Sequence, residues 1–179
     1  MKFRTGLLAV GCWIALCLGA EAKDLDLKTF YGKYTGGGVA NSEDSLYFGV
    51  TVRDTDVEIR PTADGFRVSW TTVLRQGGDP AKPDVRRRSS TADFVYGARP
   101  NLFLGKGHGD PLVGGVTSWA RISGNSLIVH ILTIGEDGLY DVQTYERTLT
   151  GAGMDLIFTR VRDGEPMRTV KAKLTRQSN

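Results

Sequence analysis

Side chains that could bind a small molecule occur along several strand-like runs of this 179-residue sequence. The candidates combine ring faces or cationic nitrogens with a place on an alternating run: Trp70, Trp119, Arg121, His130, Tyr145, Phe158 and Arg160. Each of the two arginines shares its strand face with an aromatic residue two positions before it, because side chains alternate along a strand. An inward arginine beside aromatic rings is costly unless it is paired, so it could bind a carboxylate or phosphate. It could instead extend to a rim over an aromatic ring.

The two histidines are candidates for acid–base chemistry or ligand contact. His130 shares a strand face with Ile128 and Leu132, which predicts a buried imidazole that needs a hydrogen-bond partner. It could be a structural residue or could contact a ligand oxygen in a pocket. His108 lies in the glycine-rich loop 105–111 and could be an exposed loop residue, a general base or a metal ligand. No second histidine or cysteine lies at ligand spacing, so we predict no metal site.

The run from Leu139 to Leu149 mixes polar, aromatic and charged residues. One of its faces carries Asp141, Gln143, Tyr145 and Arg147. A binding surface that combines such groups with apolar side chains suits an amphipathic ligand. The charges could instead face solvent and pair across neighbouring strands.

Motifs of several enzyme classes are absent from the sequence. There is no Gly-x-Ser-x-Gly elbow, no His-Glu-x-x-His zinc motif and no phosphate-binding loop. We therefore predict no catalytic residue and no cofactor, and we favour a protein without enzymatic activity. Acid–base chemistry by His130, Tyr145 or an aspartate stays an alternative, of the isomerase or cyclase type.

The elements that must position these residues are four strand-like runs in close succession. They span Val116–Ile122, Ser126–Ile134, Leu139–Leu149 and Met154–Arg162. The short loops between them carry Gly, Asn and Asp, which tolerate positive φ at little steric cost. Hairpins in sequence predict an antiparallel meander.

The remaining sequence indicates more strands and no long amphipathic helix. Further runs span Leu46–Arg53, Asp56–Arg60, Phe66–Arg75, Ser89–Tyr96, Asn101–Leu104 and Met167–Arg176. Residues 24–30 predict a short helical turn, and Gly36-Gly37-Gly38 predicts a flexible stretch before the next strand. The pattern is typical of an all-β sandwich or barrel. We predict an antiparallel up-and-down β-barrel of about 8–10 strands with a short N-terminal helical turn, because its hairpins follow one another without long crossings.

Residues 1–22 have the layout of a cleaved secretory signal peptide. Lys2 and Arg4 precede the apolar run 7–18, and Ala20-Glu21-Ala22 supplies small residues for cleavage near Ala22. The apolar run is short for a bilayer span, which needs about 20 residues. We therefore expect an exported protein, periplasmic or secreted, rather than one that retains a membrane anchor.

Both cysteines lie in the expected signal peptide, residues 1–22. Cys12 and Cys17 are the only two in the sequence, so the chain after cleavage would have neither a disulfide nor a thiolate. Leu16 is bulky for the position before a lipid-bearing cysteine, which favours a soluble protein over a lipid-anchored one. We expect residues 23–179 to form a single β-barrel domain.

Charge excludes one class of partner and suggests another. The net charge is +3 at pH 7, and acidic and basic residues are interleaved, so the sequence does not predict nucleic-acid binding. Arg86-Arg87-Arg88, near Lys82, is the densest cationic run. It could bind anionic envelope lipid, or it could be a solvated strand end.

The segment Phe30-Tyr31-Gly32-Lys33-Tyr34 resembles the opening of lipocalin-like proteins, the calycin group. In these, a short helical turn leads into Gly-x-Trp; here Gly32 matches the glycine and Tyr34 stands where the tryptophan is expected. The resemblance implies that a late arginine, Arg160 or Arg176, packs against this ring. The family's Thr-Asp-Tyr motif has no match around residues 141–145. The resemblance implies a barrel with a ligand cavity and carries over no ligand identity.

Together these observations favour an exported, soluble β-barrel that binds a small hydrophobic or amphipathic ligand in its lumen. An alternative is an envelope interaction module with a filled barrel that acts through its surface. The luminal isomerase or cyclase is the third hypothesis.

Overall fold

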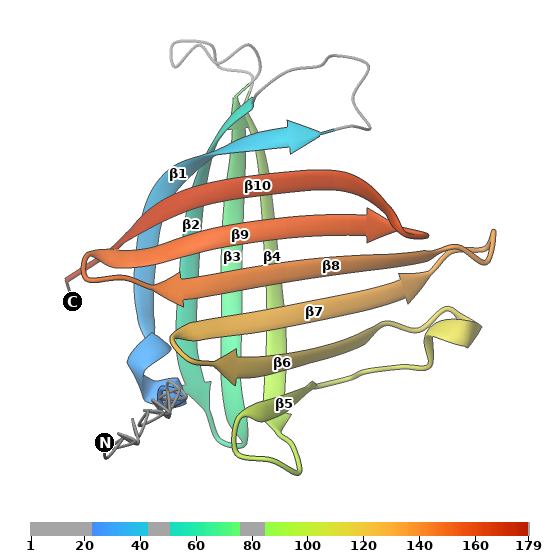
Figure 1. Ribbon diagram of the computed structural model, residues 1–179, viewed down its shortest axis with the longest axis horizontal. Coiled ribbons are helices and arrows are strands. Elements are labelled where there is room, and N and C mark those ends of the chain that lie inside the picture. The colour runs from blue at the N-terminus through green and yellow to red at the C-terminus, as the bar shows by residue number, and fades with distance from the viewer. Residues whose placement is uncertain (1–22, 43–50, 76–84, 179) are drawn as a thin grey trace, which may run out of the picture.

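The computed structural model describes residues 23–42, 51–75 and 85–178, which form ten antiparallel strands closed into a barrel (Figure 1). The strands are β1 (Gly32–Ser42), β2 (Thr51–Thr62), β3 (Gly65–Arg75), β4 (Val85–Tyr96), β5 (Leu102–Gly105), β6 (Thr117–Ser123), β7 (Ser126–Ile134), β8 (Tyr140–Leu149), β9 (Gly153–Arg162) and β10 (Glu165–Arg176). Each strand pairs with its neighbour in the sequence, and β10 pairs with β1. The predicted up-and-down barrel is confirmed. The predicted signal peptide, residues 1–22, lies outside the described residues.

Tight turns set the strand order. Gly124, Gly138 and Gly164, in the turns after β6, β7 and β9, have φ angles of 58°, 77° and 87°. Glycine adopts this left-handed conformation without the steric cost that other residues meet. The meander predicted between Val116 and Arg162 is confirmed as β6 to β9. In Figure 1 the strands from β6 to β10 cross those from β1 to β4.

Helical structure in the described part of the chain is limited to single 3-10 turns. The predicted N-terminal turn is η1 (Leu27–Phe30), and Asp26 caps it by accepting a hydrogen bond from the Lys28 amide at 2.9 Å. A second turn, η3 (Pro111–Val113), lies in the loop before β6. Within residues 23–178, no described helix has the length and apolar character of a membrane span.

Two details of β1 and β2 differ from the sequence prediction. The runs 46–53 and 56–60, predicted as two strands, belong to β2 where they are described, because the ladder to β3 continues unbroken from Arg53 to Thr62. The glycine triplet, predicted as a flexible stretch before the next strand, lies inside β1 in regular register with β10. A Cβ at Gly36 would lie 2.0 Å from the Lys173 carbonyl oxygen, so glycine allows the two backbones to approach closely.

Apolar side chains fill the end of the barrel that η1 covers. Phe66 stacks on Phe94 with centroids 5.1 Å apart and meets the edge of Phe103 at 5.0 Å. Phe30 of η1 is fully buried beside this cluster. Inward residues of the other strands complete the floor: Ile59, Val68, Ile122, Leu127, Met154 and Leu174. We call this end the floor and the opposite end, where β8 and β10 begin, the distal end.

Tyr34 and Arg176 join the floor to the last strand. The Tyr34 ring is 1% exposed, and its hydroxyl donates a hydrogen bond to the Phe30 carbonyl at 2.8 Å. The Arg176 guanidinium lies 5.3 Å from the Tyr34 ring centroid and donates to the carbonyls of Thr29 and Tyr31 at 2.6 and 2.7 Å. The expected packing of a late arginine on Tyr34 is confirmed for Arg176. The other candidate, Arg160 of β9, lies near the distal end.

Tyr34→Ala is expected to lower the free energy of unfolding by about 3–5 kcal/mol, because it removes a fully buried ring and the contact to Arg176. Arg176→Ala should cost less, since much of that side chain is exposed. Chemical denaturation of both variants checks this, with Lys171→Ala on the outer face of β10 as control. A Tyr34→Ala protein as stable as the parent would contradict the prediction.

Candidate ligand-binding lumen

A cavity of about 420 Å³ lies inside the distal half of the barrel. It is lined by inward side chains of six strands: Thr55, Trp70, Thr72, Arg88, Ser90, Gln143, Tyr145, Arg147, Leu156, Phe158, Arg160 and Arg168. The strands that form the floor continue into this half with the same face turned inward, because side chains alternate along each strand. The volume is within the range of small-molecule sites, about 300–1,000 Å³.

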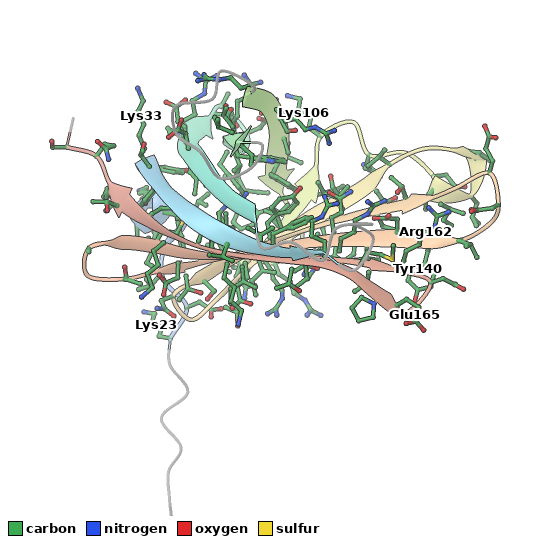
Figure 2. All side chains as sticks on the ribbon, turned by 90° about the horizontal axis from the view of Figure 1, so that it is seen from above. Lys23, Lys33, Lys106, Tyr140, Arg162 and Glu165 are labelled. Atoms are coloured by element: carbon green, nitrogen blue, oxygen red, sulfur yellow. The ribbon has the colours of Figure 1, made fainter. Side chains whose placement is uncertain are left out.

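Strand register arranges the wall of this cavity in layers. Between β8 and β9, Arg147 lies opposite Leu156, Tyr145 opposite Phe158, and Gln143 opposite Arg160. Apart from Arg147, the inward side chains thus change from apolar at the floor, through aromatic, to cationic and polar at the distal end. In Figure 2, Tyr140, Arg162 and Glu165 lie together at that distal end.

Three aromatic rings form the middle layer. Tyr145 lies between Trp70 and Phe158, with centroid distances of 5.1 and 4.8 Å. Its hydroxyl donates a hydrogen bond to Oε1 of Gln143 at 3.1 Å, and burial raises the pKa of the phenol. The three rings are tilted against one another and offer an apolar wall with a polar edge, which suits an amphipathic ligand.

Arg147 is a buried cation beneath this layer. The side chain is 1% exposed, and its Cζ lies 5.2 Å from the Tyr145 ring centroid and 5.7 Å from that of Trp70. Its Nε and Nη1 atoms are buried and have no hydrogen-bond partner among the described residues. Burial lowers the pKa of this guanidinium to about 10, so it remains charged at neutral pH.

The other cations of the cavity lie nearer the distal end. Arg160 forms an ion pair with Asp141, with Nη2 and Oδ2 2.6 Å apart, and Arg168 lies opposite it in the ladder of β9 and β10. Arg88 lines the same cavity from β4 and is exposed. None of the cavity-lining residues in the described part of the chain is acidic. Among the described residues, the lining of this cavity therefore carries an excess of positive charge.

The structure places the seven predicted site residues on both sides of the barrel wall. Four line the cavity: Trp70, Tyr145, Phe158 and Arg160. Trp119, Arg121 and His130 belong to the opposite strand faces, outside the lumen. Arg147 is not one of the seven predicted site residues, although the sequence places it on the same strand face as Tyr145, two positions later.

His130 is a half-buried residue of the outer face. Its ring stacks on Trp119 of the paired strand with centroids 4.8 Å apart, and its Nδ1 lies 3.1 Å from the Thr144 hydroxyl. The imidazole thus has the partner that its burial requires. Desolvation, followed by the nearby charge of Arg121, lowers its pKa. A role of these outer residues in ligand binding stays a prediction.

A second cavity of about 490 Å³ lies beside the first and shares four lining residues with it. It lies where β4 pairs with β5 over only residues 94–96, next to the loop that follows β5. His108 lines this cavity and is exposed, and Lys106 forms an ion pair with Asp64 at 3.2 Å. No group of three or more His, Cys, Asp or Glu side chains that could hold a metal occurs in the described ranges.

The arginine triplet does not form a continuous cationic surface where it is described. Arg88 lines the lumen, whereas Arg87, the adjacent residue of β4, is exposed on the other face. Alternation along the strand divides the run between two faces. Binding of anionic lipid by the triplet stays a prediction.

Comparison with solved structures supports the fold. A protein of unknown function from the DUF3598 family of Nostoc punctiforme PCC 73102 has a TM-score of 0.56 and 16% identity, over 88% of this chain and 51% of that chain. This chain thus spans about half the length of that protein, and the likeness shows the fold alone. An S-type phycobiliprotein lyase from Guillardia theta has a TM-score of 0.38 and 9% identity, over 87% and 94% of the two chains. That score is too low to carry an argument.

The closed, ten-stranded antiparallel barrel agrees with the barrel that the lipocalin-like resemblance implied. No protein-family model matches the sequence, and no curated protein matches it.

Arg147→Met is expected to raise the free energy of unfolding of the ligand-free protein by about 1–3 kcal/mol. Methionine fills a similar space and removes two buried donors that lack partners, each of which is costly. Chemical denaturation checks this, with Arg99→Met in an exposed loop as the control for loss of charge. A less stable Arg147→Met protein would show that the contacts with the two rings outweigh the cost of burial.

Because of His130, we predict that the folded protein loses stability on mild acidification. Its pKa in the folded protein lies below the ordinary value of 6.5, so at lower pH the unfolded chain binds the proton more readily. The melting temperature should therefore fall as pH drops through about 6.5, and should level off below the lower folded-state pKa. Melting curves from pH 8 to pH 5 should show a smaller fall for His130→Gln than for the control His108→Gln. Equal falls would contradict the prediction.

Proposed function

We propose that the protein is exported and binds a small amphipathic ligand inside the distal half of the barrel. The observation that carries this proposal is the luminal cavity of about 420 Å³, with an aromatic wall and polar groups on the same strand faces. The side chains at the floor are close-packed, whereas those around this cavity leave a volume that a small organic molecule can occupy. The proposed ligand would place its apolar part against Trp70, Tyr145 and Phe158.

The cavity also favours this proposal over the two alternatives. A filled barrel that acts through its surface would continue the apolar packing of the floor to the distal end. The hypothesis of a luminal isomerase or cyclase depended in part on His130. This residue lies on the outer face, so Tyr145 and Asp141 would have to supply the acid–base chemistry. Binding requires only the groups that line the lumen.

Export is supported by the sequence pattern of residues 1–22, a charged start followed by an apolar run and small residues. On this proposal the barrel meets its ligand in the periplasm or outside the cell. N-terminal sequencing of the protein from its own host should find a mature chain that begins near Lys23.

Native mass spectrometry of the protein from its own host tests ligand binding. We expect a bound mass that disappears on denaturation, is lost in Trp70→Ala and is retained in Trp119→Ala, whose ring lies on the outer face. Incubation with a solvent extract of the host before measurement guards against loss of ligand during purification. Identical native and denatured masses after that incubation would overturn the proposal.

A further inference from the structure

We propose that the luminal ligand carries an oxyanion, a carboxylate or a phosphate, that binds the Arg147 guanidinium at the inner end of the cavity. This inference rests on the proposed luminal binding and names the class of ligand. It is carried by the unsatisfied donors of a fully buried cation and by the charges around it.

The Arg147 guanidinium has hydrogen-bonding capacity that the described residues leave unused. Its Nε and Nη1 atoms have no acceptor there, although buried donors in proteins nearly always have one. A guanidinium binds a carboxylate or phosphate through two parallel N–H···O bonds, which are shorter and stronger than neutral hydrogen bonds. An oxyanion from the ligand would supply the missing acceptors after a small turn of the guanidinium toward the cavity, because both atoms are buried in the ligand-free protein.

The charge of Arg147 is also unbalanced. No acidic side chain of the described residues lines the cavity. Asp141, near the distal end, is engaged by Arg160. Positive charge in a cavity with low-dielectric walls attracts anions, and Arg88 at the distal end adds to that field. With a neutral ligand, this buried cation would have no counter-charge from the described residues that line the cavity.

Two aromatic rings hold the guanidinium in place. Its Cζ lies within 6 Å of the centroids of Trp70 and Tyr145, which are themselves in contact. Cation–π contacts of this kind satisfy part of the charge without using its N–H groups. The cation is therefore positioned in advance, which lowers the entropic cost of binding an anion.

The layers of the wall set the shape of the ligand. Arg147 lies at the level of Leu156. Arg160 lies four residues after Leu156 along β9, roughly 13 Å away. Phe158 lies between these two levels. The site thus fits a molecule with an oxyanion at its inner end and an apolar or aromatic body beyond it.

Two fluorescent probes of nearly the same shape test this inference. 1-Anilinonaphthalene-8-sulfonate carries an oxyanion on an aromatic body, and N-phenyl-1-naphthylamine lacks only the sulfonate. The parent protein should bind the sulfonate probe at least tenfold more tightly. Arg147→Met should abolish this preference, and Arg99→Met, which removes the same charge from an exposed loop, should retain it.

The outcomes separate this inference from the proposed function. If neither probe binds the parent protein, luminal binding fails and the inference fails with it. If both probes bind equally and Arg147→Met changes neither affinity, luminal binding stands and the oxyanion is wrong. Should Arg147→Met not fold, Arg147→Gln takes its place; an unchanged preference in that variant would also overturn the inference.

Competitors with one chain and different head groups distinguish the two kinds of oxyanion. Octanoate, octyl phosphate and octanol are each titrated against the bound sulfonate probe. We expect one of the two anions to displace the probe at least tenfold more effectively than octanol, and the more effective one identifies the head group. Octanol as the best competitor would count against the inference.

Discussion

The pairing of β1 with β10 closes the barrel, and it depends on two backbones coming closer than most side chains permit. Gly36 and Gly38 lie at that crossing, where an added Cβ would overlap the carbonyl oxygens of Lys173 and Lys171. Arg176, at the end of β10, then reaches back to η1 and Tyr34. Without this closure two strand edges would be exposed, and the inward faces would not enclose a cavity.

Closure also means that one set of strand faces must serve two different environments. Toward η1 the inward residues are apolar and pack closely, whereas toward the distal end they become aromatic, polar and cationic. The packed floor fixes the strands, and so it fixes the positions of side chains two to six residues farther along each of them. A rigid floor beneath a polar cavity is a sound arrangement for a binding site, because positioned groups need little reordering on binding.

Arg147 marks the boundary between these two environments. It is surrounded by Leu156, Leu127 and two aromatic rings, and a charge in such a place is destabilising unless it has a partner. Conflicts between local rules and the folded structure tend to occur at functional sites. The buried guanidinium is such a conflict, and it lies at the inner end of the cavity of the barrel.

Turn chemistry and alternation, which are local properties, were enough to predict the meander and the barrel, whereas the packing of an arginine on Tyr34 was implied by the lipocalin-like resemblance. They also placed Tyr145 and Arg147 on one strand face, because that follows from spacing alone. What the sequence could not decide was which face of a strand would be inside. β7 is apolar on both faces, with Val129 inward and Ile128 outward, so His130 was equally compatible with the lumen and the outer wall. The contact of Trp70 with Arg147 joins β3 to β8, and only closure of the sheet brings residues so distant in sequence within reach.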